Sequence, residues 1–249
     1  MKYTFLLCFS LVMFSARAQD KNQFYALDAR MNQTVLDSSK YILWIHQAED
    51  GNWQWDYYYT WASLVKSTRY ADHDGTVQNG RFFIYRDGSL DSLGEYDHGK
   101  KNGIFYKFKN NPADSPVLIR RYEYVQDSLT GFADLTKPGT DPADTGKIKK
   151  AEFPGGTTGW SDYLQKNLEY PQRTSEKGIG GTAMIGFEIN DSGEIKKPFI
   201  LKSVEYSIDQ EALKLIKNSG TWDPETKNGV AEHTVEVRSL RFAPEPAKP

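Results

Sequence analysis

The alternation of apolar and polar positions in the first half of the chain predicts short β-strands. Aromatic-rich runs such as residues 82–85 are separated by turn signals between residues 41 and 108, and no helical period competes with them. Each turn signal places a glycine where a positive φ is cheap. These signals are Asp50-Gly51, Asp74-Gly75, Asp87-Gly88 and His98-Gly99. We therefore expect an antiparallel β-meander.

An internal repeat in the same region indicates stacked hairpins. The run Asn79-Gly80-Arg81-Phe82-Phe83-Ile84-Tyr85 recurs as Asn102-Gly103-Ile104-Phe105-Tyr106-Lys107-Phe108. With its flanking turns, the segment of about residues 70–108 resembles the MORN-type repeat of exported bacterial proteins. A single hairpin is barely stable alone, so neighbouring hairpins must share an aromatic face. We favour the interpretation that these aromatics pack in the core. The alternative, which stays open, is that they form an exposed strip that binds glycan or a partner protein.

The second half of the chain shows helical and strand periods in turn. A helix is expected where apolar residues fall at helical spacing before Tyr170-Pro171, because proline prevents simple continuation. Its apolar residues are Trp160, Tyr163, Leu164 and Leu168. Residues 181–189 then alternate as a strand, residues 190–193 form a turn, and a second strand runs over about 194–202.

A second helix and a last strand complete this half. Ser207 and Gln210 have the spacing of a capping box, and an apolar stripe follows them. The last strand spans about residues 234–242, with a bulge expected near Arg238-Ser239, where the alternation slips. The order helix, strand, strand, helix, strand makes the fold class α+β: an N-terminal antiparallel β-meander of repeat hairpins, then a small two-layer α-β-β-α-β domain.

Several motifs of the second half occur together and in order over about residues 151–243. They are Phe153-Pro154-Gly155-Gly156, Tyr163-Leu164, Asn167-Leu168, Tyr170-Pro171, Gly178-Ile179, Gly181-Thr182, Asp209, Glu211-Ala212, Trp222, Pro224 and Asn228-Gly229. In this combination the segment resembles the TonB C-terminal domain. The resemblance implies a small sheet backed by two helices.

The resemblance also implies a function for the last strand. In this family an extended segment of an outer-membrane receptor is captured by strand addition, which requires an unpaired sheet edge. The residues expected to bind the partner are Thr234, Val235, Glu236, Val237 and Arg238. The motif residues expected to be structural are Phe153, Pro154, Gly155, Gly156, Tyr170, Pro171, Trp222 and Pro224.

The N-terminal residues predict export. Lys2 precedes an apolar stretch over residues 5–14, which ends in Ala16-Arg17-Ala18, so residues 1–18 have the layout of a signal peptide cleaved before Gln19. The stretch is roughly half of the 20 or so apolar residues that a membrane-spanning helix needs. The expected location is the periplasm, with inner-membrane anchoring as the alternative. Removal of residues 1–18 changes the formal net charge from −2 to −4, which disfavours binding to nucleic acid.

Composition divides the remaining chain into parts. Residues 19–125 are expected to form the β-rich MORN-like repeat domain, and residues 151–243 the TonB-like C-terminal domain. Between them, residues 126–150 are polar and carry Pro138, Gly139 and Pro142, which predicts a linker. Residues 244–249 are expected to be a mobile tail.

No pattern in the sequence indicates an enzyme or a cofactor. The single cysteine, Cys8, lies in the expected signal peptide, so thiolate chemistry and cysteine-ligated metals are excluded from the mature chain. The four histidines lack zinc-ligand spacing, and Asp72 and Asp74 before Gly75 lack the further carboxylates of a calcium loop. There is no Gly-x-Ser-x-Gly elbow or phosphate-binding loop.

Three hypotheses follow for the function. The first is a periplasmic, transport-related binding protein that captures an outer-membrane receptor or another envelope protein by strand addition. The second is a membrane-anchored energy transducer of TonB type, although the linker carries only two prolines, Pro138 and Pro142, where such transducers have a long proline-rich spacer. The third is an envelope protein that binds or hydrolyses glycan. An open sheet edge also permits a homodimer by strand exchange.

Overall fold

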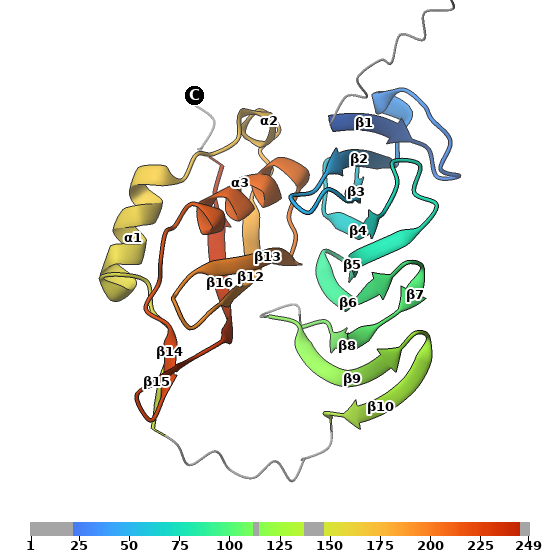
Figure 1. The fold of residues 1–249 in the computed structure, drawn as a ribbon. Helices are drawn as coiled ribbons and strands as arrows, with labels where there is room; N and C mark the ends of the chain where they lie inside the picture. Colours follow the sequence, from blue (N-terminus) through green and yellow to red (C-terminus); the bar gives the residue numbers. More distant parts are fainter. Residues whose placement is uncertain (1–21, 112–114, 137–146, 245–249) are drawn as a thin grey trace, which may run out of the picture.

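The protein is described by a computed structural model over residues 22–111, 115–136 and 147–244. The strands of these residues form a 13-stranded sheet and a separate three-stranded sheet. Figure 1 shows the strands β1 to β10 in sequence order along one side of the molecule and the helices along the other. The expected signal peptide, its cleavage site at Gln19, Pro138, Gly139 and Pro142 of the expected linker, and the tail beyond Pro244 lie outside the described residues.

The first half is an antiparallel β-meander, as its alternation predicts. Each strand from β1 to β6 pairs with the next, and β8, β9 and β10 continue beyond β6. The strands are β1 (Asn22–Leu27), β2 (Tyr41–Gln47), β3 (Trp53–Tyr59), β4 (Leu64–Tyr70), β5 (Gln78–Arg86), β6 (Ser89–Asp97), β7 (Lys100–Lys101), β8 (Gly103–Lys109), β9 (Val117–Val125) and β10 (Ser128–Asp134), with a 3-10 turn at η1 (Leu36–Ser38). The strand β10 lies inside the stretch expected as a linker, where Leu129 and Phe132 continue the pairing with β9.

The predicted glycine turns connect these strands. All four glycines of the turn signals have positive φ, for example 76° at Gly88 and 85° at Gly99. The preceding residues Asp87 and His98 also have positive φ, at 50° and 48°. Two consecutive positive φ angles suit the right-handed twist of a tight hairpin.

The two faces of the meander pack differently. On one face, Leu27, Leu43 and Ile45 form a small buried cluster that half-buried aromatics such as Trp53 and Trp55 cover. On the other face, Leu64, Phe83 and Leu90 pack against residues of the second half of the chain. Most aromatics of this region are at least half-buried, while Phe24, Tyr59 and Phe132 are 52%, 38% and 59% exposed.

The second half is a smaller α/β unit in the predicted element order. Its strands β12 and β16 have the bounds that the alternation predicts, and β13 begins one residue later than expected. The elements are β11 (Ile148–Lys149), α1 (Gly156–Asn167), α2 (Gln172–Ser175), β12 (Gly181–Ile189), β13 (Ile195–Lys202), α3 (Tyr206–Lys217), β14 (Glu225–Lys227), β15 (Val230–Glu232) and β16 (Thr234–Phe242).

Two local predictions in this half are wrong. The helix α3 is capped by Glu205, whose carboxylate accepts from the Ser207 backbone N–H at 2.8 Å, so Ser207 is not the cap. The bulge expected at Arg238-Ser239 is absent, because β16 pairs with β12 in one unbroken register. The slip in alternation has another cause, the half-buried polar pair of Glu236 and Arg238.

Backbone and side-chain hydrogen bonds join the two halves where β6 and β13 meet. Ser203 is the central residue: its backbone N–H donates to the Gly88 carbonyl at 2.7 Å, and its hydroxyl accepts from the Leu64 N–H at 2.7 Å. The same hydroxyl donates to the buried Asp209 carboxylate at 2.5 Å. Tyr85 adds a hydrogen bond from its hydroxyl to the Ile200 carbonyl at 2.9 Å.

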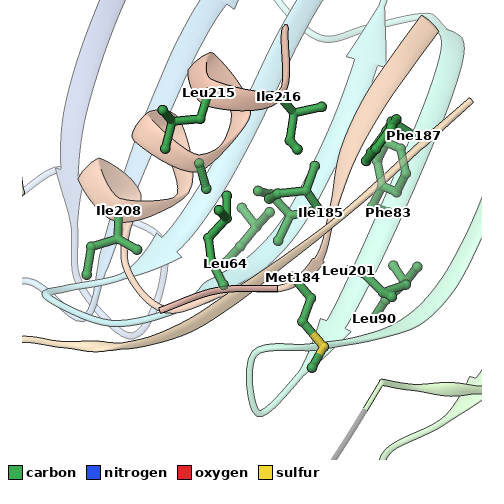
Figure 2. Packing of buried hydrophobic residues seen from close by; sticks show 14 of the residues in the cluster. Leu64, Phe83, Leu90, Met184, Ile185, Phe187, Leu201, Ile208, Leu215 and Ile216 are labelled. Carbon is green, nitrogen blue, oxygen red and sulfur yellow. The ribbon is translucent and has the colours of Figure 1, made fainter. Parts of the chain in front are cut away.

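One hydrophobic core lies behind this junction. Leu64, Phe83 and Leu90 of the meander pack in the same cluster as residues of β12, β13 and α3. Figure 2 shows Leu215 and Ile216 of α3 above Ile185 of β12, with Ile208 and Leu64 to the left and Phe83 to the right. Because burial of apolar surface is the main stabilising term, the shared core means that each half stabilises the folded state of the other.

Candidate functional site: the edge strand β16

The strand β16 has one paired side and one open side. It pairs antiparallel with β12 along its whole length, from Thr234 opposite Ile189 to Phe242 opposite Gly181. It is the last strand in the order of its sheet, so no second strand pairs with it among the described residues. An edge of this kind presents unpaired backbone N–H and C=O groups that an extended chain can bind.

Side chains of β16 alternate between a solvent face and an inner face. Val235 and Val237 are 58% and 36% exposed, whereas Leu240 and Phe242 are buried. Glu236 and Arg238 share the inner face with those two apolar residues. This polar pair on the inner face, and not a bulge, causes the slip in the hydrophobic alternation.

The Glu236–Arg238 pair covers a buried tryptophan. The two side chains form an ion pair at 2.7 Å, and the Arg238 guanidinium lies 4.7 Å from the ring centre of Trp222. Trp222 is 2% exposed and donates its indole N–H to the Ser219 hydroxyl at 3.0 Å. The pair therefore contributes packing and a cation–π contact where apolar side chains were expected.

The Val237 carbonyl indicates which backbone groups face the open edge. It accepts a hydrogen bond from Arg238 Nη1 at 2.9 Å. In an extended strand the N–H and C=O of one residue point to the same side, and this direction alternates along the strand. We infer that the amides of Val235 and Val237 lie on the open side, and that Thr234, Glu236 and Arg238 contribute side chains rather than edge amides.

Most family-motif residues lie near Trp222 or at the start of a helix. The ring of Phe153 lies 5.4 Å from that of Trp222 in an edge-on contact. Gly155 and Gly156 have φ of 81° and 65° and begin α1, beside Pro154. The hairpin before β16 starts directly after Pro224, where Asp223 exchanges backbone hydrogen bonds with Glu152 at 2.8 and 3.0 Å.

The Tyr170-Pro171 motif fixes the chain between α1 and β12. The Tyr170 hydroxyl donates to the Ile179 carbonyl, and Pro171 caps the short helix α2. The Pro171 carbonyl accepts from the Thr174 hydroxyl at 2.9 Å. The motif thus holds the start of β12, to which β16 is paired.

A cavity of about 500 Å³ lies beside the inner face of β16. It is lined by one residue of β16, the chain before α1 and the start of that helix: Arg238, Lys149, Lys150, Ala151, Glu152, Phe153, Gly156, Thr157 and Trp160. Lys150 is paired with Glu225 at 2.9 Å. The sequence alone does not reveal this cavity, because Lys149 and Lys150 lie in the polar stretch that predicts a linker.

The remaining candidate groups have structural partners. Asp72 accepts from the backbone N–H groups of Thr76 and Val77 at 3.0 and 2.9 Å, as in a turn, and these hydrogen bonds lower its pKa. His46 contacts Asp56 at 3.1 Å, and His98 contacts Asp97. Within the described ranges, no group of three or more histidine, cysteine or acidic residues is arranged to hold a metal ion.

Comparison with known protein families gives a match in the C-terminal part of the chain. Residues 166–244 match the family described as the Gram-negative bacterial TonB protein C-terminal. The match covers Tyr170, Pro171, Trp222, Pro224 and all of β16, and it begins within α1, after Phe153, Pro154, Gly155 and Gly156.

No curated protein and no solved structure matches the chain. In the part of the chain that is described, no helix combines the length and the apolar character that crossing a membrane requires. The family match supports a TonB-type C-terminal domain over residues 166–244, in an envelope protein related to transport.

Proposed function

We propose that this protein captures an extended segment of an outer-membrane receptor or another envelope protein by adding it as a strand to β16. The observation that carries the proposal is that β16 pairs with β12 on one side and has an open second side within the described residues. Backbone hydrogen bonds to such an edge provide affinity with little dependence on sequence. Specificity then comes from side-chain contacts on both faces of the added strand.

Two features beside the edge fit an added strand. Val235 and Val237 present apolar surface on the outer face, which a partner's alternate side chains would cover. On the inner face, the cavity at Phe153, Trp160 and Arg238 is open to side chains that point the other way. A bound strand would therefore find apolar contacts on one face and a mixed aromatic and cationic site on the other.

A location and a domain organisation belong to the same proposal. Residues 1–18 would direct export and be removed before Gln19, which leaves a diffusible periplasmic protein. The meander would be a MORN-like repeat domain over residues 19–125, joined through residues 126–150 to the TonB-like domain over residues 151–243. The intact mass of the endogenous protein tests the first step: a mass that begins at Gln19 in the periplasm fits, and one that retains Met1 in the inner membrane favours the energy transducer.

Site-specific photo-crosslinking tests the edge itself. A photoreactive amino acid at Val235 is expected to cross-link in cells to an extended segment of an outer-membrane protein. Val237→Pro removes an N–H from the open side and is expected to abolish this cross-link. Val237→Thr is the matched control, because it keeps the N–H and β-branching, and it should retain the cross-link.

The fold of each variant is checked by its thermal unfolding midpoint. A cross-link of normal yield in folded Val237→Pro protein would overturn the strand assignment. A cross-link to a second copy of the chain would instead identify the homodimer by strand exchange as the occupant of this edge.

A further inference from the structure

A groove of about 970 Å³ lies between the meander and the second half of the chain, and no residue of β16 lines it. Its wall on one side is the inner face of β2 to β6, including Gln54, Asp56 and Arg81. Its opposite wall comes from β13 and α3, including Phe199 and Leu213. The volume is in the range of pockets that hold small ligands or a few peptide residues.

Most charged side chains that line the groove are already paired. Arg69 donates to Asp50 at 2.7 Å, and Lys217 contacts Glu49 at 3.1 Å. The buried Asp56 accepts from Gln54 Nε2 at 3.1 Å and lies 3.1 Å from His46 Nε2. The charges of Arg69 and Asp50, and of Lys217 and Glu49, offset each other, and Asp56 has its own hydrogen-bond partners. These residues form a polar wall of the groove.

Arg81 is different from these residues. Its guanidinium makes one hydrogen bond, from Nη1 to the Lys197 carbonyl at 3.2 Å, and forms no ion pair with a described carboxylate. It lies 5.1 Å from the ring centres of both Phe83 and Phe199. Burial lowers the pKa of this arginine, and the charges of Glu188 and Glu95 oppose that effect. Glu95 lies opposite Arg81 on β6 and also lines the groove.

A guanidinium that has unused N–H donors and no ion-pair partner can bind a carboxylate. Arginine carries five N–H donors in a planar fork that matches two carboxylate oxygens, and four of the Arg81 donors have no protein acceptor. Charge-assisted bidentate pairs of this kind are strong when the surroundings are partly apolar. The Phe83 and Phe199 rings supply such surroundings and would also contact an apolar side chain next to the carboxylate.

The lining favours a peptide over a sugar. Sugar rings bind to free aromatic faces, but the Trp44 ring is covered by His46 at 3.6 Å and Tyr96 packs against Phe82 and Phe105. The groove is instead lined by side-chain amides. Those of Asn52, Gln54 and Asn79 bond to other protein groups, whereas that of Asn102 makes no hydrogen bond within the described residues and can bond a peptide backbone. We propose that the groove binds a peptide that ends in a free carboxylate, with that carboxylate on the Arg81 guanidinium and an apolar C-terminal side chain against the half-buried ring of Phe199, which stacks on Phe83.

Equilibrium dialysis of the intact protein against peptide pools tests the proposal. The probes are tetrapeptides of random sequence that end in leucine or phenylalanine, with either a free carboxylate or a C-terminal amide. We expect the protein to enrich the free-carboxylate pool at least about tenfold over the amidated pool, because the amide cannot form the charge-assisted pair. Equal enrichment of both pools, or none, overturns the proposal without any mutation.

Variants locate the binding in the groove. Arg81→Met keeps the apolar length of the side chain and is expected to remove the preference for the free carboxylate. Arg86→Met is the matched control, since Arg86 is an exposed arginine of the same strand outside the groove, and it should bind as the unmodified protein does. Both variants are first compared by thermal unfolding.

Further variants distinguish this site from the edge of β16. Val237→Pro should leave the enrichment unchanged, whatever its effect on strand addition. Enrichment that is lost in Val237→Pro but kept in Arg81→Met would overturn the proposal. Binding of a uronic-acid disaccharide that needs Arg81, with no peptide enriched, would also overturn it, in favour of an acidic sugar.

Discussion

The buried carboxylate of Asp209 is expected to make the stability of the protein depend on pH. Asp209 is fully buried at the junction of the two halves and accepts hydrogen bonds from the Ser203 hydroxyl and the Val204 N–H. Burial raises its pKa to about 7, although these hydrogen bonds oppose the shift. In the unfolded chain the pKa of an aspartate is about 3.9.

The sign of the effect follows from proton binding. Between about pH 4 and pH 7 the folded protein holds a proton on Asp209 that the unfolded chain has lost, so stability falls as pH rises. A shift of about three pKa units corresponds to roughly 4 kcal/mol, at about 1.4 kcal/mol per unit. The contribution is complete below about pH 4 and is lost as pH rises through about 7.

Urea unfolding between pH 4.5 and 8 measures this contribution. The asparagine of Asp209→Asn cannot ionise, so this variant should not lose stability as Asp209 does when pH rises. The difference between the free energies of unfolding of the variant and of the unmodified protein should therefore shift in favour of the variant by several kcal/mol from pH 4.5 to pH 8. Asp162→Asn, at an exposed position of α1, is the matched control and should follow the unmodified protein. Parallel curves for Asp209→Asn and the unmodified protein would refute the reasoning.

Two further substitutions test the core and the junction by the same unfolding assay. Ser203→Ala removes the acceptor of the buried Leu64 N–H and a donor to Asp209, so we expect a loss of about 1–3 kcal/mol per unsatisfied group, and an unchanged midpoint would contradict the bridging role. Gly186→Ala places a Cβ 2.5 Å from the Phe199 ring, which should destabilise the protein by about 1–3 kcal/mol, and a neutral result would mean that the ring moves freely.

Some parts of the fold are determined by sequence alone because their causes are local. The strands β12 and β16 have the bounds predicted from a two-residue period, since one face of each must be buried. The turns at Gly88 and Gly99 follow from the freedom of glycine at positive φ. The TonB-type motifs also carry local requirements, such as the proline of Tyr170-Pro171 that separates α1 from α2.

Other features depend on which surfaces meet, and these only the tertiary structure decides. Their sequence pattern places Glu236 and Arg238 on the surface, but in the structure the ion pair that they form packs over the buried Trp222. The sequence pattern places Arg81 on the polar side of a strand. In the structure it lies 5.1 Å from the ring centre of Phe199, a residue distant in sequence, and both line the groove. A charged side chain has the same local pattern whether it faces water or another element, so its environment is set by long-range packing.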